Sequence, residues 1–173
     1  STLVFISHAG EHKQQYARPL NDQLQRSGLS SRNIFFDEKS LKMGTDPHVA
    51  MRVAAMKCRV MICLISREYL YKKWCLLELF LVYARALAIT RQGRRDFDDN
   101  DVRLLPVFYS VDADVAARDW VDIAKQHLPL SKMPVGLKVE LRDVSDEARL
   151  QRHHATVIAN VRKTVVLKRH GGV

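Results

Sequence analysis

The chain has 173 residues, of which 47% are hydrophobic, and its formal net charge is +9. That length suits one domain with a single sizeable core, and the longest apolar run, at 74–82, falls far short of the roughly 20 residues that span a bilayer. The odd number of cysteines (Cys58, Cys63 and Cys75) and their lack of metal-ligand spacing argue against a disulfide framework and favour a reducing compartment.

The chain opens with a predicted strand and a predicted helix. The apolar, β-branched run at 2–6 predicts the strand, and the small residues at 7–10 permit a tight turn after it. Apolar residues at every fourth position predict an amphipathic helix over 13–27, which ends at Gly28 and which Pro19 kinks early. No signal-like segment precedes the strand, so we expect the sequence to begin at a domain edge and the protein to be cytoplasmic.

A second strand, a third strand and two helices are predicted next. Residues 33–37 predict a strand, and the polar loop after it leads to Asp46 and Pro47, a cap and first-turn proline for a short helix. The uninterrupted apolar run at 60–65 predicts a central parallel strand that is covered on both faces, and a helix over 66–88 follows. One side of the short helix is expected to consist of Val49, Val53, Ala54 and Met56.

The last part of the chain completes the alternation of strands and helices. Residues 104–109 predict a fourth strand despite Pro106, and we expect a helix at 115–128, an edge strand at 135–141 and a final helix at 148–167. This order predicts one α/β domain with a flavodoxin-like, three-layer arrangement: a parallel sheet with helices on both faces. The inner side of the final helix is expected to carry Leu150, Val157, Ile158, Val161 and Val165.

One acid stands among apolar neighbours. Glu78 lies inside the run at 74–82, so an ionised carboxylate there must find partners or lose its charge. Ligands of parallel sheets gather at the carboxyl ends of the strands, and the helix with Trp74 and Glu78 follows such an end. The loop at 7–10 ends at the same edge, so these elements are expected to share one cleft.

Four pieces of sequence in this order resemble the Toll/interleukin-1 receptor (TIR) domain, and its plant and bacterial branch more than its animal branch. They are Val4-Phe5-Ile6-Ser7 with Gly10-Glu11; Phe35-Phe36-Asp37 with Leu41 and Gly44; Ser66, Tyr69 and Trp74-Cys75-Leu76-Leu77-Glu78-Leu79; and Pro106-Val107-Phe108-Tyr109-Ser110-Val111-Asp112. The resemblance implies a five-stranded parallel sheet. In enzymatic members it implies cleavage of the nicotinamide-ribose bond of NAD+, which is then a substrate and not a cofactor. Lys72 stands where a serine often precedes the Trp-Cys pair.

The resemblance places the family's catalytic glutamate on Glu78. A carboxylate held beside the oxocarbenium-like ribose that nicotinamide leaves behind stabilises it more in a water-poor pocket than in bulk solvent. Trp74 is either an aromatic wall of that pocket or a core residue. The other substrate-binding candidates lie in the first two loops, where His8 and Lys39 also fit ordinary polar surface residues: Ser7, His8, Gly10, Glu11, His12, Lys13, Phe36 and Lys39.

Self-association is also implied, because in the family the loop after the second strand of one copy completes the cleft of the next. Leu41, Met43 and Gly44 in that loop are therefore candidates for a homotypic contact. Other TIR domains are possible partners. The resemblance implies a role in immune or cell-death signalling.

Three alternatives remain open. A non-enzymatic adaptor would dock other TIR domains and leave NAD+ intact. A 2′,3′-cyclic nucleotide synthetase would act on nucleic acid through Cys75, and the positive charge suits such a partner, although no aromatic residues interleave with the basic clusters. A flavodoxin-like redox or nucleotide-binding protein is disfavoured, since no GxGxxG loop or P-loop follows the first strand. His153 and His154 lack further ligands at metal spacing, so we expect them on the helix surface and expect no metal site.

Overall fold

The computed structural model describes residues 2–36, 44–72, 74–79, 81–82, 85, 102–109, 139–141 and 147–165. The strands are β1 (Val4–His8), β2 (Ile34–Phe35), β3 (Val60–Ile65), β4 (Arg103–Tyr109) and β5 (Val139–Leu141). The helices are η1 (Gly10–His12), η2 (Lys13–Ala17), α1 (Arg18–Arg26), η3 (Ser31–Asn33), α2 (Pro47–Lys57), α3 (Arg67–Leu70) and α6 (Glu147–Arg162). Residues 74–79, 81–82 and 85 are also helical, and we refer to them as the 74–79 helix.

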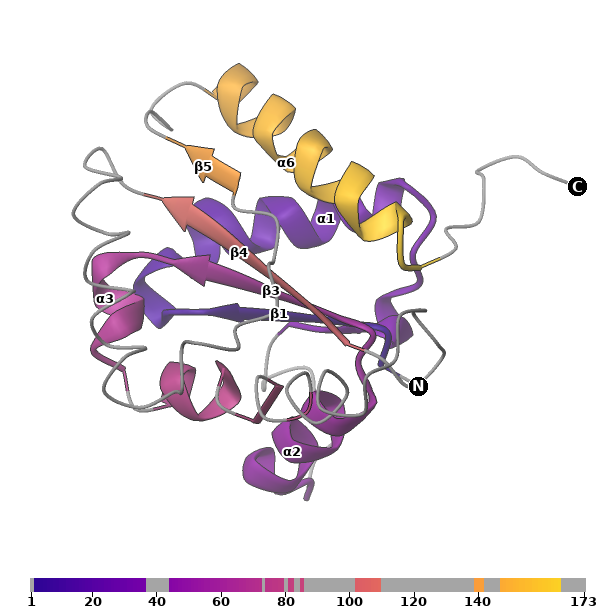
Figure 1. The fold of residues 1–173 in the computed structure, drawn as a ribbon, viewed down its shortest axis with the longest axis vertical. Coiled ribbons are helices and arrows are strands. Elements are labelled where there is room, and N and C mark those ends of the chain that lie inside the picture. Colours follow the sequence, from indigo (N-terminus) through magenta and orange to yellow (C-terminus); the bar gives the residue numbers. More distant parts are fainter. Residues whose placement is uncertain are drawn as a thin grey trace, which may run out of the picture.

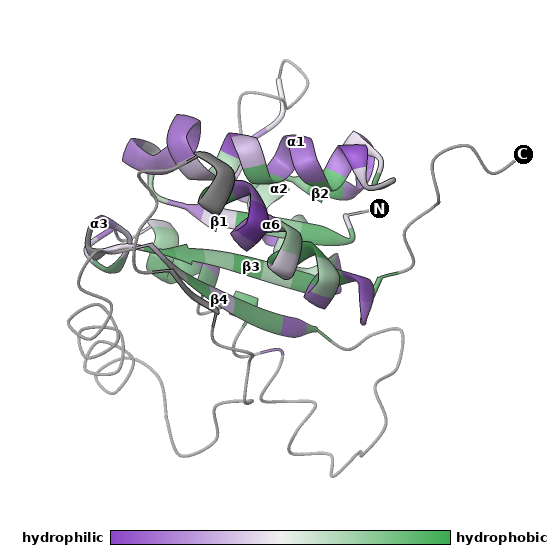
Figure 2. Ribbon diagram, turned by 90° about the horizontal axis from the view of Figure 1, so that it is seen from above, coloured by the Kyte–Doolittle hydropathy of each residue, from purple (hydrophilic) through white to green (hydrophobic). Residues whose placement is uncertain are grey.

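The strands form one five-stranded sheet in the order β2-β1-β3-β4-β5, and every neighbouring pair is parallel. Helices α1 and α6 lie on one side of the sheet, and α2 lies on the other (Figure 1). The predicted flavodoxin-like, three-layer α/β fold is therefore confirmed. The strands are the most hydrophobic part of the ribbon (Figure 2), as expected for a sheet that is covered on both sides.

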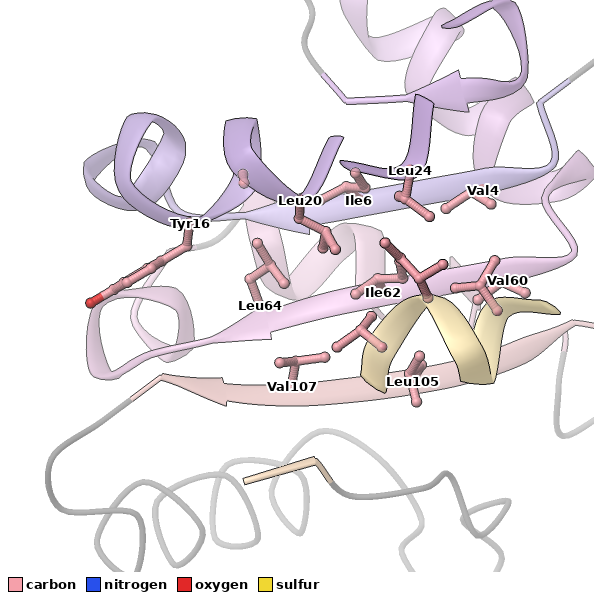
Figure 3. Packing of buried hydrophobic residues seen from close by; sticks show 14 of the residues in the cluster. Val4, Ile6, Tyr16, Leu20, Leu24, Val60, Ile62, Leu64, Leu105 and Val107 are labelled. Carbon is pink, nitrogen blue, oxygen red and sulfur yellow. The ribbon is translucent and has the colours of Figure 1, made fainter. Parts of the chain in front are cut away.

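Alternation along the strands divides the core into two faces. Phe5, Met61, Cys63 and Ile65 pack with α2, α3 and the 74–79 helix, and we call this side the Glu78 face. On the opposite side, which we call the His154 face, the side chains of β1, β3 and β4 pack with α1 and α6 (Figure 3). All six residues of β3 are buried, so the predicted central strand is confirmed.

The first helix follows its predicted course. Its opening turn, η2, is a wider π-type turn that leads into α1, where Pro19 has no N–H to donate to an ordinary α-helical bond. The helix stops at Ser27, and Gly28 adopts a φ of 110°, a left-handed conformation that glycine reaches without a steric penalty. The early irregularity and the glycine stop thus both agree with the sequence.

Pro106 lies inside β4, in register with Cys63 of β3. The predicted fourth strand is thus present as β4 despite this proline. The predicted edge strand is present as β5. In the part of the chain that the structure describes, no helix is both long and apolar enough to span a membrane.

The predicted single helix over 66–88 is wrong. Helix α3 ends at Leu70, and bonds from Tyr71 N to Glu68 O (3.2 Å) and from Lys72 N to Tyr69 O (3.2 Å) close its last turn. A new helix then begins, with Leu76 N bonded to Lys72 O at 3.0 Å. Tyr69 and Glu78 therefore lie in separate helices.

Two predicted helix faces also need correction. On α2, Met51, Ala54 and Ala55 are buried, so only Ala54 of the four expected residues faces the core, and the other three are exposed: Val49 by 57%, Val53 by 46% and Met56 by 62%. The final helix, α6, ends at Arg162 and not at 167, so four of the five expected inner residues lie on it and Val165 lies just after it. All five are buried, but so are His153 and His154, which were expected on the surface. These two rings lie against Tyr109 of β4.

Candidate functional site

Glu78 meets a hydroxyl donor in the core. The acid is only 6% exposed, and Ser7, which is 1% exposed, donates from Oγ to Glu78 Oε2 at 2.5 Å. Ser7 shares the Glu78 face with Phe5 because side chains alternate along β1. The acid in an apolar run has thus found the polar partner that its burial requires.

Tyr69 is a third member of this buried group. Its hydroxyl lies 2.8 Å from Ser7 Oγ and 3.4 Å from the carbonyl oxygen of Cys75, and the residue is fully buried. Ser66 fixes its backbone, since Ser66 Oγ accepts a bond from Tyr69 N at 3.1 Å and caps α3. Burial raises the pKa of Tyr69 well above its usual range, and the charge of Glu78 adds to this, so Tyr69 is a neutral donor.

Two buried thiols surround the same group. Cys75 is 3% exposed and its Sγ donates to the carbonyl oxygen of His8 at 3.5 Å. Burial raises the pKa of Cys75 to about 12, with the negative charge of Glu78 as the next cause. Burial also raises the pKa of Cys63. Cys75 is therefore a protonated thiol at neutral pH, and its surroundings give no support to a nucleophilic role.

Trp74 lies at the border of this group. It is half-buried and packs against the core of the Glu78 face. Its ring centroid is 4.5 Å from that of His48, in an edge-on arrangement with an interplanar angle of 77°. His48 is in the first turn of α2, so the tryptophan joins the 74–79 helix to that turn.

A second group of predicted residues gathers on the His154 face, at the ends of β1 and β2. The ring of His8 lies 5.4 Å from that of Phe36, and its Nε2 is 3.1 Å from the Phe36 carbonyl oxygen. Lys13 Nζ lies 5.9 Å from the Phe36 ring centroid, and the guanidinium of Arg18 lies 5.8 Å from it. Arg18 was not predicted here. Both cations stand at a distance typical of a cation–π contact.

The predicted residues Glu11 and His12 contact charged side chains of the segment after β3, Glu11 in an ion pair with Lys72 and His12 in a hydrogen bond with Glu68. Lys72 Nζ lies 2.7 Å from Glu11 Oε1, and His12 Nε2 lies 3.0 Å from Glu68 Oε2. The bond from Lys72 lowers the pKa of Glu11, and the bond from His12 lowers that of Glu68. These two contacts connect η1 to Glu68 of α3 and to Lys72 just after that helix, so they join the first loop to the segment after β3.

The remaining predicted residues are two glycines that the structure describes and three residues that it does not. A Cβ added at Gly10 would meet no atom within 4 Å, so there is open space beside the first loop. Gly44 adopts a φ of 88°, which favours glycine. Lys39, Leu41 and Met43 lie outside the described residues.

The sequence reasoning missed Tyr69 as a site residue, although one signal was available. Ser66 is a plausible N-cap directly after a buried strand, and Tyr69 is three residues further on, in the first turn that the cap fixes. Ser7 and Cys63 also face each other across β1 and β3 on one side of the sheet. Together these patterns place a hydroxyl-bearing ring close to Ser7.

This arrangement suits stabilisation of a positive charge. A carboxylate that is buried and oriented by a hydroxyl, at the carboxyl edge of a parallel sheet, interacts strongly with a developing cation because little water screens it. Among the described residues, no three His, Cys, Asp or Glu side chains gather as a metal site would require.

Comparison with known proteins agrees with this picture. A family model described as a TIR domain matches residues 4–133. The NAD(+) hydrolase TcpC of Escherichia coli O6:H1 (strain CFT073) is 33% identical over 109 residues, which are 63% of this chain and 31% of the relative. The 2′ cyclic ADP-D-ribose synthase AbTIR of Acinetobacter baumannii is 31% identical over 84 residues, 49% of this chain and 30% of the relative.

The fold has a counterpart among solved structures. The TIR domains of the activated Roq1 resistosome that recognises the pathogen effector XopQ match with a TM-score of 0.51 at 22% identity, over 92% of this chain and 84% of that one. Matched segments span about a third of the curated relatives' length, 31% and 30%. With a family model that covers residues 4–133, the chain belongs to the TIR domain family.

Proposed function

We propose that this TIR domain is an NAD+ nucleosidase, which breaks the bond between nicotinamide and ribose and releases nicotinamide with ADP-ribose or a cyclic ADP-ribose isomer. The observation that carries the proposal is the Glu78 carboxylate, 6% exposed and bonded to Ser7 at 2.5 Å, in the helix that follows β3 and α3. The names of the relatives, an NAD(+) hydrolase and a cyclic ADP-ribose synthase, support it.

The chemistry requires little beyond a well-placed carboxylate. The nicotinamide ring of NAD+ is cationic while it is attached to ribose and becomes neutral when it departs with the bonding electron pair, so no acid must protonate it. The positive charge moves to the ribose, where Glu78 stabilises it. Water then attacks the ribose carbon to give ADP-ribose, or an atom of the same molecule attacks to give a cyclic isomer.

The decisive experiment is incubation of the purified chain with NAD+, with nicotinamide and each ADP-ribose isomer followed by mass. Wild type should release nicotinamide, and Glu78→Gln, which keeps the size of the side chain, should be slower by at least about a hundredfold. Asp22→Asn on the exposed side of α1 is the matched control and should keep wild-type turnover. Undiminished turnover in Glu78→Gln would remove the assignment.

The proposal includes activity that depends on self-association. The exposed stripe of Val49, Val53 and Met56 on α2 supports it, because these side chains follow directly after the loop of Leu41, Met43 and Gly44. Specific activity should rise with protein concentration, and Val53→Lys should weaken that rise while leaving the unfolding transition unchanged. Activity strictly proportional to concentration would count against assembly.

The same assay separates the alternatives. Intact NAD+ at high protein concentration, together with self-association, would identify a non-enzymatic adaptor of other TIR domains. Release of 2′,3′-cyclic monophosphates from RNA or DNA would identify a synthetase acting on nucleic acid. If a cyclic ADP-ribose isomer is the product, it is the candidate signal in immunity or cell death.

A further inference from the structure

Two hydrogen bonds join three buried oxygen atoms into a chain that ends at Glu78, which we call the hydrogen-bonded line. Ser7 Oγ is 2.5 Å from Glu78 Oε2, and the Tyr69 hydroxyl is 2.8 Å from Ser7 Oγ. The three residues are 6%, 1% and 0% exposed in the order Glu78, Ser7 and Tyr69, so bulk water does not compete for these bonds. Hydrogen bonds in such surroundings are stronger than in water and polarise one another.

The proton positions in this line follow from valence. A serine hydroxyl has one proton and an ionised carboxylate has none, so Ser7 donates to Glu78. Ser7 Oγ can then only accept from Tyr69, whose alternative acceptor, the carbonyl oxygen of Cys75, is more distant at 3.4 Å. Donation therefore runs from Tyr69 to Ser7 and from Ser7 to Glu78.

We propose that Tyr69 is a positioning residue for Glu78, acting through Ser7 to fix the orientation of the carboxylate and to favour its charged form. This inference rests on the proposed function for its catalytic consequence. The inference also assigns the Ser7 hydroxyl to the Glu78 carboxylate, since Ser7 is 1% exposed and its Oγ is already hydrogen-bonded to both Tyr69 and Glu78. The break after α3 serves this arrangement, because it lets Tyr69 and Glu78 approach Ser7 from separate helices.

The test uses hydroxyl deletions with a matched control. Tyr69→Phe and Ser7→Ala remove one hydroxyl each, and Ser7→Thr keeps it. Tyr109→Phe is the control, because Tyr109 is only 5% exposed and its hydroxyl bonds to His154 Nε2 at 2.8 Å on the opposite face. Near-UV circular dichroism confirms that each variant is folded.

The first readout needs no NAD+. The carboxyl carbon of Glu78, labelled with ¹³C and identified by its absence in Glu78→Gln, is titrated by NMR. Its midpoint should move upward by roughly one to two pH units in Ser7→Ala and by a smaller shift, roughly 0.2 to 0.6 units, in Tyr69→Phe. Ser7→Thr and Tyr109→Phe should keep the wild-type midpoint. In the double variant Ser7→Ala with Tyr69→Phe, the shift of the Glu78 midpoint should equal that of Ser7→Ala alone, because Tyr69 acts through Ser7.

The second readout is the pH profile of NAD+ cleavage. The acid limb of kcat/KM should follow the NMR midpoints, and kcat should fall roughly two- to fivefold in Tyr69→Phe with KM unchanged. An unmoved midpoint in Tyr69→Phe, additive shifts in the double variant, or an unchanged kcat would overturn the proposal. If wild type cleaves no NAD+, the proposed function fails while the titration still decides the hydrogen-bonded line. If Ser7→Ala does not fold, Tyr69→Phe against Tyr109→Phe decides it.

Discussion

The two faces of the sheet bury ionisable side chains in opposite ways. On the Glu78 face, the acid receives a hydrogen bond from Ser7 at 2.5 Å, and a donor of this kind favours the charged form. On the His154 face, His153 and His154 are 7% and 1% exposed, and among the described residues neither His153 Nε2 nor His154 Nδ1 has a hydrogen-bond partner. Apolar surroundings favour the neutral imidazole.

The lowered pKa values of His153 and His154 are the electrostatic consequence of this burial. Burial lowers the pKa of His153, and burial together with the charge of His153 lowers the pKa of His154 to about 4. The Tyr109 hydroxyl bonds to His154, and burial raises the pKa of Tyr109, so this contact joins two neutral groups. The Glu78 face thus directs a hydroxyl donor at its buried acid, whereas the His154 face packs its histidine rings in their uncharged form.

The largest expected effect concerns the thiols, because Cys58, Cys63 and Cys75 all lie on the Glu78 face. At pH 8, a disulfide reagent should label them at least roughly a thousandfold more slowly than in the urea-unfolded chain, since burial raises the pKa of Cys58 to about 11 and of Cys75 to about 12. All three should react together when the chain unfolds. Rapid labelling of one thiol in the native protein would show that this face opens locally.

The next largest effect compares a core truncation on each face. Leu20→Ala on α1 and Leu79→Ala in the 74–79 helix each remove a buried side chain, 0% and 2% exposed, and each should lower the free energy of unfolding by about 2–5 kcal/mol. Only Leu79→Ala should also lower NAD+ turnover, because it adjoins Glu78. Urea unfolding and the nicotinamide assay measure the two effects. Equal turnover in both variants at 25 °C would remove the functional distinction between the faces.

Much of the fold could be predicted from local pattern. The uniform apolar run of β3, the stop at Gly28 and the four buried apolar positions on α6 were predictable because each depends on residues within one element. The break at 71–72 was not, because no glycine or proline marks it in the sequence. On α2, apolar residues occur on both sides, so periodicity alone could not identify the buried one.

The site was predictable in part for the same reason. Glu78 was found because an acid among apolar residues is conspicuous, but its partner Tyr69 depends on a contact across 62 positions of sequence with Ser7. The histidine pair shows a different failure. Positions 153 and 154 fit the inner stripe of α6, three and four residues after Leu150, and only their polarity suggested the surface.

A smaller effect that would sharpen the comparison is the pH dependence of the free energy of unfolding that His154 causes. The unfolded chain binds a proton at His154 as the pH falls through about 6.5, whereas the folded chain does so only near pH 4, so acid shifts the equilibrium toward unfolding. Between pH 7.5 and pH 5, His154 alone should reduce the free energy of unfolding by about 2 kcal/mol. His154→Gln should remove that part of the pH dependence in urea unfolding. The same slope in wild type and variant would show that the imidazole is protonated in the folded state.

The smallest effect concerns the exposed ion pair between Glu11 and Lys72. Glu11 and Lys72 join the first loop to the chain after α3, and both are exposed, so salt should screen their attraction. Glu11→Lys should therefore raise KM for NAD+ by roughly two- to fivefold at low ionic strength and have little effect at 0.5 M salt. The reversed pair, Glu11→Lys with Lys72→Glu, should restore the wild-type value because it restores the attraction. Failure of the reversed pair to recover would mean that Glu11 contacts the substrate itself, and the ion pair would then be a feature of the unliganded protein alone.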